Sequence, residues 1–123
     1  MTSEGNRPRR DRLLALAGEG WASGPVAVAI GRRARLAGLA PVSGPIGLLL
    51  RTTTIHTIGM RQRLGVASLG PRGRVRRTVA LAPGRLFVDL GAYWILELPP
   101  VAGLPKAGDR LRVRPILDWW PEH

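Results

Sequence analysis

The sequence predicts a mostly β domain, a small barrel or sandwich with one or two short helical elements. Three observations lead to this fold class. Short apolar runs rich in β-branched residues recur along the chain, glycine and proline turns separate them, and little of the chain favours a helix. Many short strands with tight turns are typical of barrels and sandwiches. The 123 residues, 45% of them apolar, are enough for one domain with its own core.

The chain divides into a tail, a domain and a second tail. Residues 1–12 are polar and basic, so we expect a disordered N-terminal tail. Residues 13–115 carry the apolar runs and are predicted to form a single β-rich domain. Residues 116–123 form a C-terminal tail in which Trp119 and Trp120 either dock on the domain or bind a partner, since aromatic residues are enriched at interface hot spots.

The first half of the domain contains two expected strands and the expected helical elements. Residues 13–17 (LLALA) fit either a short helical turn or an irregular strand. Residues 25–30 (PVAVAI) are rich in β-branched side chains and predict a strand. Residues 32–39 (RRARLAGL) contain helix-forming residues, with two leucines spaced i, i+3, and predict a short helix. Residues 46–50 (IGLLL) predict a buried strand.

The second half contains four expected strands, at residues 64–69, 74–81, 92–98 and 111–113. The first two are joined by the turn sequence GPRG at residues 70–73. The third, AYWILEL, has the highest β-propensity in the chain and one apolar face. Residues 99–108 form a loop that has room for one helical turn.

Composition and charge restrict the classes of function. The chain has 19 basic and 8 acidic residues, a net charge of +11, and 18 of the basic residues are arginine. Two interpretations are open: a basic composition that only solvates the surface, or a face that binds anions. The absence of cysteine excludes disulfides, thiolate metal sites and cysteine nucleophiles.

The sequence predicts a cytoplasmic protein without a membrane span. No apolar run approaches the ~20 residues that a spanning helix needs. Arg9 and Arg10 precede a short apolar stretch, loosely as in a twin-arginine export signal. Glu19 interrupts that stretch and no small-residue cleavage site follows, so we do not expect export.

Seven arginines of the second half fall into two clusters, one around the GPRG turn and one along the last strand. They are Arg72, Arg74, Arg76, Arg77, Arg110, Arg112 and Arg114. If these strands are neighbours, the guanidinium groups form a stripe suited to phosphates. Phe87 is the only phenylalanine and no aromatic residues interleave with the arginines, so base readout is not supported. The expected partner is RNA, DNA or an acidic protein, and the oligomeric state stays open.

The segment 46–98 has a further pattern. A strand is followed by a polar segment, an apolar strand, a glycine-turned hairpin and a closing strand that ends in proline. The residues that carry this pattern are His56, Thr57, Gly59, Met60 and Arg61, then Gly73, Arg74 and Val75, then Ile95, Leu96, Glu97, Leu98 and Pro99. In this pattern the chain resembles the domain of unknown function 192 family, over about residues 26–114.

The resemblance implies a β-rich fold and no particular activity. It also implies a pocket lined by the residues at the family's recurrent polar positions, which are His56, Thr57, Met60 and Glu97. The chain departs from the family at Gly65, where the family usually has an aspartate. If that aspartate serves a reaction, this chain has lost it.

Two interpretations of residues 52–57 stay open. Either the hydroxyl groups and the His56 imidazole line a pocket, with His56 as hydrogen-bond donor or acid/base, or the segment is a strand edge whose threonines satisfy backbone groups. Glu97 interrupts an apolar strand, so it either faces outward or pairs with an arginine.

Catalytic and metal chemistry have little support in the sequence. The only histidines are His56 and His123, so we expect neither a metal nor another cofactor. No serine lies in a nucleophile-elbow pattern. Three functions are considered: a non-enzymatic binding module that uses the arginines, a small-molecule or peptide pocket around His56 and Glu97 with hydrolase or transferase chemistry, and a subunit of a larger assembly. The binding module is preferred, and enzymatic activity is left open.

Overall fold

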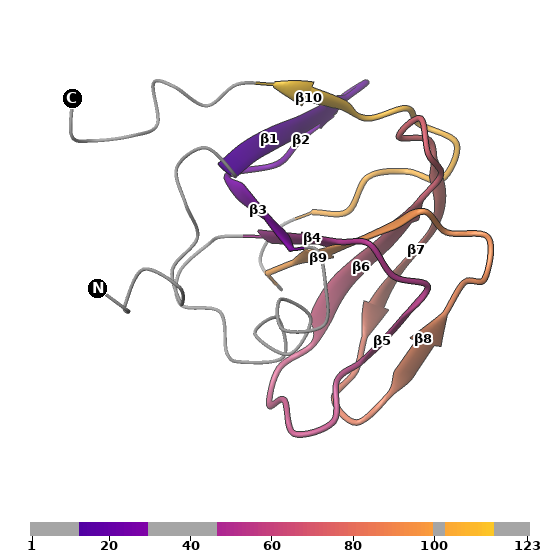
Figure 1. Cartoon of the computed structure of the whole chain (residues 1–123). Helices are drawn as coiled ribbons and strands as arrows, with labels where there is room; N and C mark the ends of the chain where they lie inside the picture. The colour runs from indigo at the N-terminus through magenta and orange to yellow at the C-terminus, as the bar shows by residue number, and fades with distance from the viewer. Residues whose placement is uncertain (1–12, 30–46, 100–102, 115–123) are drawn as a thin grey trace, which may run out of the picture.

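The structure is a computed structural model that describes residues 13–29, 47–99 and 103–114. These residues form ten strands and no helix, which confirms the mostly β class (Figure 1). The strands are β1 (Leu13–Gly18), β2 (Trp21–Ala22), β3 (Val26–Ala29), β4 (Gly47–Leu50), β5 (Thr54–His56), β6 (Leu64–Leu69), β7 (Val75–Leu81), β8 (Leu86–Val88), β9 (Trp94–Leu98) and β10 (Arg112–Arg114).

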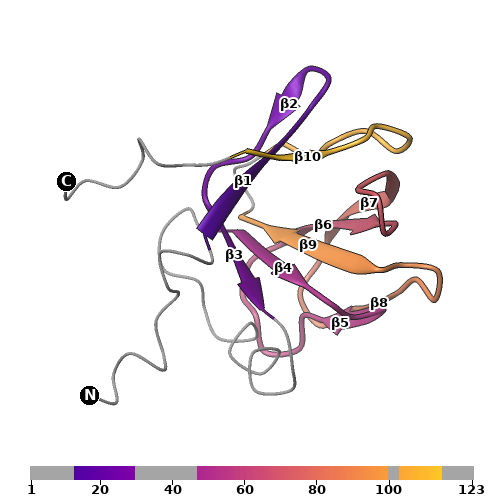
Figure 2. The ribbon, with the colours of Figure 1, turned by 45° about the horizontal axis from the view of Figure 1, so that its top comes forward.

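Eight of these strands form one curled sheet in the order β10-β1-β3-β4-β9-β6-β7, with β2 paired to β1. Neighbouring strands are antiparallel except β3 and β4, which run parallel. The sheet curls so that the β10 end of this order turns back towards the β7 end (Figures 1 and 2). Strands β5 and β8 form a separate two-stranded sheet.

The two ends of the curled sheet meet where the chain enters β7 and β10. Arg74, just before β7, pairs with Arg110, just before β10, in an isolated antiparallel bridge. The Leu111 N–H also donates a hydrogen bond of 2.8 Å to the Gly73 carbonyl. These contacts join the outermost strands of the sheet and give it its barrel-like form.

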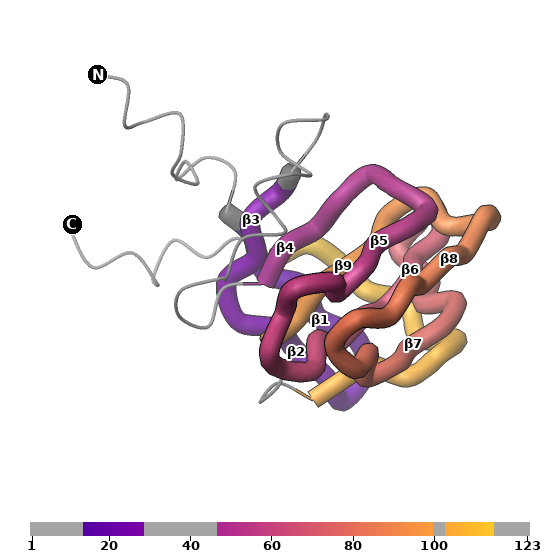
Figure 3. The backbone as a smooth tube through the Cα atoms, turned by 90° about the horizontal axis from the view of Figure 1, so that it is seen from below, coloured from indigo at the N-terminus to yellow at the C-terminus, as the bar shows by residue number. Residues whose placement is uncertain are grey.

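Alternation along the strands sends side chains to two cores, one on each side of the sheet. The inner core contains Leu16, Val26, Leu49, Ala67, Leu69, Val75, Leu96, Leu98 and Leu111. The outer core contains Ile55, Leu64, Val66, Leu81, Phe87 and Ile95. Strands β5 and β8, which lie side by side in Figure 3, bring Ile55 and Phe87 to this second core. All six residues of β6 are buried, which explains why its sequence is apolar apart from Ser68.

The strand predicted at residues 64–69 is confirmed at both ends. The other predicted strands are confirmed over most of their described residues, and where both ends are described the bounds differ by one or two residues. The helical alternative for residues 13–17 is wrong, since these residues lie in β1. Leu16 joins the inner core and Leu14 packs against it, so the two leucines follow the period of a strand. The short strands β2, β5 and β8 were not predicted.

Several predictions fall on residues that the structure does not describe. They are the helix at 32–39, the disordered tail at 1–12 and the C-terminal tail at 116–123 with its two tryptophans. Of the loop at 99–108, residue 99 and residues 103–108 are described, and they contain a turn and no helical turn.

Candidate functional site

Five of the seven predicted arginines gather where the two ends of the sheet meet. We name this set the arginine seam: Arg72, Arg74, Arg110, Arg112 and Arg114. Backbone pairing holds the two segments together, because the Val75 N–H donates to the Asp109 carbonyl at 2.7 Å and Arg74 is the bridge partner of Arg110. The condition stated for the arginine stripe, that the hairpin and the last strand are neighbours, is therefore met.

The seam arginines lie at the edge of the inner core. Leu111 is buried in that core, whereas Arg110 and Arg112, on either side of it, are exposed. All five arginines of the seam are exposed. Two of them also fasten the backbone: Arg74 Nη1 donates to the Gly108 carbonyl at 2.9 Å, and Arg110 Nε donates to the Arg72 carbonyl at 3.4 Å.

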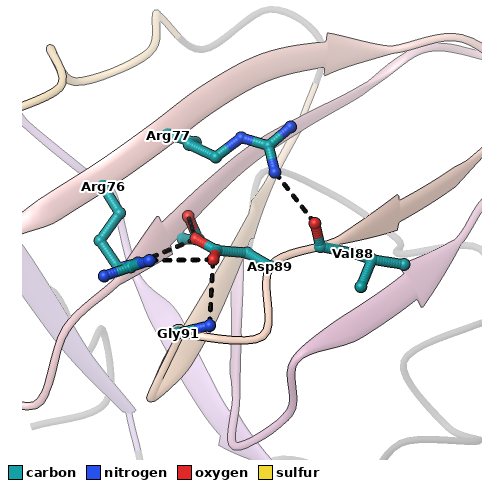
Figure 4. Close-up of polar contacts among 6 residues, drawn as sticks. Arg76, Arg77, Val88, Asp89 and Gly91 are labelled. Carbon is teal, nitrogen blue, oxygen red and sulfur yellow. Dashed lines mark hydrogen bonds and ion pairs between the residues drawn. The ribbon is translucent and has the colours of Figure 1, made fainter.

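Arg76 has a different role, because it pairs with the buried Asp89 (Figure 4). Its Nε donates to Asp89 Oδ2 at 2.9 Å and its Nη2 to Oδ1 at 3.1 Å. The Ser68 hydroxyl donates to Oδ2 at 2.7 Å, and the Gly91 N–H donates to Oδ1 at 3.2 Å. The Arg76 hydrogen bonds lower the pKa of Asp89 to about 2, although burial acts in the opposite direction. This ion pair spans the strand β7 and the turn after β8, and the sequence analysis did not predict it.

Arg77 is also occupied by neighbouring groups. Its Nη1 donates to the Val88 carbonyl at 2.9 Å, and its guanidinium carbon lies 4.8 Å from the centre of the Phe87 ring. Both contacts fasten β8 to β7, and Figure 4 shows the one with Val88. The charges of Arg76 and Arg77 therefore serve packing first, and the five seam arginines are the better candidates for an external anion.

The predicted pocket residues lie in several different settings. Thr57 is fully buried in the turn after β5. Its hydroxyl donates to the Ala82 carbonyl at 2.6 Å and accepts from the Arg85 N–H at 2.9 Å. His56 is half-buried, and its Nδ1 accepts a 3.3 Å hydrogen bond from the Ile58 N–H. Thr57 thus satisfies backbone groups, as the strand-edge interpretation of this segment expects, while ligand binding by His56 stays a prediction.

Met60 and Glu97 complete the predicted pocket set. Met60 packs against the outer core. Glu97 lies in β9 between Leu48 of β4 and Val66 of β6, and it is 5% exposed. Among the described residues no hydrogen bond or ion pair connects Glu97 with His56. Glu97 is neither outward-facing nor paired with a described arginine, and burial raises the pKa of its carboxyl group to about 7.

The surroundings of Gly65 explain why an aspartate does not fit at this position. It lies on the inner side of β6, where an added Cβ would be 3.0 Å from Leu104 Cδ2 and 3.3 Å from Leu98 Cβ. A carboxylate here would be pressed against two leucine side chains, and burial of an unpaired charge is unfavourable.

The raised pKa of Glu97 leads to a prediction for stability against pH. The folded-state pKa of about 7 exceeds the ordinary value of 4.5. The carboxyl group therefore does not reduce the free energy of unfolding below pH 4.5, and this free energy declines as the pH rises from 4.5 to about 7. We expect Glu97→Gln to raise the unfolding free energy by about 3 kcal/mol at neutral to alkaline pH and to leave it nearly unchanged in acid. Urea unfolding across this range measures the effect, and Glu19→Gln, an exposed position, is the control. A gain that does not depend on pH would contradict the assignment.

A cavity of about 530 Å³ lies on the inner side of the seam. Most of its wall is apolar and comes from inner faces of the sheet, including Leu14, Val28, Leu49, Leu69, Trp94 and Val113. Three arginines of the seam, Arg72, Arg110 and Arg112, also line it. This cavity was not predicted, because its residues come from strands that are far apart in the chain.

Metal and membrane sites were sought within the same residues. In residues 13–29, 47–99 and 103–114 no three potential metal ligands of the His, Cys, Asp or Glu type lie together. The same part of the chain has no helix with the length and apolarity required to cross a membrane.

No protein-family model and no curated protein matches the sequence. Two solved structures have a similar fold. A putative transcription regulator from Sinorhizobium meliloti 1021 superposes with a TM-score of 0.66 at 17% identity, over 82% of this chain and 93% of that chain. A protein of unknown function from Novosphingobium aromaticivorans DSM 12444 gives a TM-score of 0.65 at 16% identity, over 81% of this chain and 84% of that chain. At these identities the similarity establishes the fold alone.

Proposed function

We propose that the protein is a non-enzymatic binding module that holds the phosphate backbone of a nucleic acid along the arginine seam. The observation that supports this proposal is the pairing of Arg74 with Arg110, which brings two arginine clusters from distant parts of the chain to one exposed strip. Guanidinium groups bind phosphate oxygens in a bidentate way, and a row of them suits a polyanion better than a single small anion. A cytoplasmic location, where such partners are abundant, belongs to the same proposal.

The expected binding is governed by charge and carries no base sequence specificity. Backbone contacts release counterions, so the affinity falls steeply with salt, with a slope near −0.9 per neutralised phosphate of duplex DNA. No aromatic residue belongs to the seam. We therefore expect similar affinity for duplexes of different sequence at equal salt concentration.

The test compares two triple variants that remove the same number of charges. In the seam variant, Arg72, Arg112 and Arg114 are changed to glutamine. In the control variant, the exposed Arg61, Arg63 and Arg85 are changed in the same way. The control arginines lie in the β5–β6 loop and the β7–β8 turn, at the bottom of Figure 1, away from β10. Arg74 and Arg110 are left in place because their side chains fasten the backbone of the seam.

Binding of a labelled mixed-sequence duplex is measured by fluorescence anisotropy from low to high salt. We expect the seam variant to lose about two to three units of salt slope and at least tenfold in affinity, and the control variant to lose much less. Equal losses in the two variants would show that only net charge matters. Binding to polyglutamate but to neither DNA nor RNA would also overturn the proposal, in favour of an acidic protein as partner.

A further inference from the structure

The wall of the cavity contains apolar side chains that the described residues leave uncovered. Val113 lies opposite Leu16 in the pairing of β10 with β1, so both face the inner side of the sheet. Leu16 is 4% exposed, whereas Val113 is 63% exposed. Leu14 and Val28, on inner faces of β1 and β3, are also only partly buried. As far as residues 13–29, 47–99 and 103–114 form it, the inner core is therefore incomplete at this end, and its gap is the cavity described above.

The cavity combines this apolar wall with positive charge. Arg72, Arg110 and Arg112 line it, and no acidic residue of the described part of the chain does. The hydrogen bond from Arg110 Nε to the Arg72 carbonyl holds the Arg110 side chain over the turn that borders the cavity. The volume of about 530 Å³ lies in the range of small-molecule sites, roughly 300–1,000 Å³. An apolar wall with cations on one side is complementary to a ligand that has an apolar part and an anionic group.

We infer that this cavity binds a small amphipathic anion, with its aliphatic chain against Leu14, Val28 and Val113 and its phosphate or carboxylate group at the three arginines. The inference goes beyond the proposed function, because a nucleic acid backbone is polar and would not fill an apolar cavity. The ligand binds as a single free molecule. Since the cavity and the seam share arginines, bound amphiphile and nucleic acid compete.

The test uses alkyl phosphates of increasing chain length, from butyl to octyl, as monomers below their critical micelle concentrations. Inorganic phosphate represents the head group alone, and octanol represents the chain alone. Isothermal titration calorimetry on the full chain measures the dissociation constants. Because a buried methylene contributes ~0.8 kcal/mol, we expect the affinity to rise by up to about fourfold per methylene until the chain fills the cavity. Octanol is expected to bind at least tenfold more weakly than octyl phosphate, since hydrogen bonds to charged groups contribute ~1.5–3 kcal/mol.

Two matched pairs of variants locate the site. Val113→Glu places a negative charge in the cavity at an exposed position, and Val88→Glu does the same on β8, outside the cavity lining. Arg112→Gln removes a lining arginine, and Arg61→Gln removes an exposed arginine elsewhere. We expect Val113→Glu and Arg112→Gln each to weaken octyl phosphate binding at least tenfold, and their partners to change it less than twofold.

Several outcomes would overturn the inference. An affinity that does not depend on chain length would mean that only the head group is bound. Equal weakening by Val113→Glu and Val88→Glu would place the ligand elsewhere. Binding to anionic vesicles or micelles without binding to monomers would indicate a lipid surface. These results leave the duplex-binding test untouched. Conversely, chain-length-dependent binding in a protein that fails to bind nucleic acid supports this inference and overturns only the proposed function.

Discussion

Replacing Gly73 with alanine is expected to lower the free energy of unfolding by about 3 kcal/mol, as the sum of two effects. Gly73 has a φ of +87°, a conformation that costs an alanine roughly 1–2 kcal/mol. An added Cβ would also overlap the carbonyl oxygen of Leu111, which belongs to the backbone and cannot turn aside. Gly73 is therefore the residue that allows the two ends of the sheet to approach each other.

Gly59→Ala is the matched control for this substitution. Gly59 has a φ of +86°, almost the same as Gly73, and an added Cβ would have no heavy atom within 4 Å. The Gly59→Ala variant should therefore lose only the conformational part of the unfolding free energy, roughly 1–2 kcal/mol. Urea unfolding monitored by circular dichroism gives both values. The Gly73 variant should also have a smaller salt slope in duplex binding, because Arg72 and Arg74 move away from Arg110. Equal stability losses for the two variants would show that the backbones do not meet closely at Gly73.

Thr57→Val is expected to lower the free energy of unfolding by about 2 kcal/mol, because it leaves backbone groups without a partner. The hydroxyl group of Thr57 connects the turn after β5 with the turn between β7 and β8, through Ala82 and Arg85. Valine has nearly the same shape, so packing is largely preserved and the loss isolates the two hydrogen bonds. The estimate is below the sum for two fully buried groups, since Arg85 is exposed and water reaches that turn.

Thr57→Ser supplies the control, because it keeps the hydroxyl group and removes only a methyl group. We expect it to lose about 1 kcal/mol. If the valine variant is as stable as the unaltered protein, the hydroxyl group has no structural role, and a ligand-binding role for Thr57 becomes the better explanation. Thermal unfolding in parallel with urea unfolding checks that the order of the variants does not depend on the method.

The strands that could be predicted are those with enough residues to show a pattern. β6 is bounded by Arg63 and Gly70 and is apolar apart from Ser68, so its sequence marks both ends. In contrast, β5 and β8 have three residues each, of which one, Ile55 or Phe87, is buried. A single inward residue has no period, so such strands form because neighbouring strands cover them. The short run at 13–17 is compatible with both the period of a helix and the period of a strand. It forms a strand because its leucines pack on the inner core.

The candidate site could be predicted in part for a related reason. The arginine clusters are visible in the sequence, but their meeting depends on pairing between distant segments, which the sequence analysis could state only as a condition. The ion pair of Arg76 with Asp89 depends in the same way on the fold. Neither the cavity nor the burial of Glu97 has a local signature, because both arise where several strands come together. The resemblance to the domain of unknown function 192 family stays a proposal.

The position of β7 at the end of the sheet has a consequence for aggregation. This strand is seven residues long, and in the described part of the chain only its first residues have a pairing partner on the side away from β6. An open strand edge is a template on which other chains add and form fibrils. Here the register shift between Ser68 and Leu69 distorts the ladder beside it, and Arg76 and Arg77 place bulky charged groups along the strand. The same arginines that fasten β8 thus protect the folded protein from edge-to-edge association at high concentration.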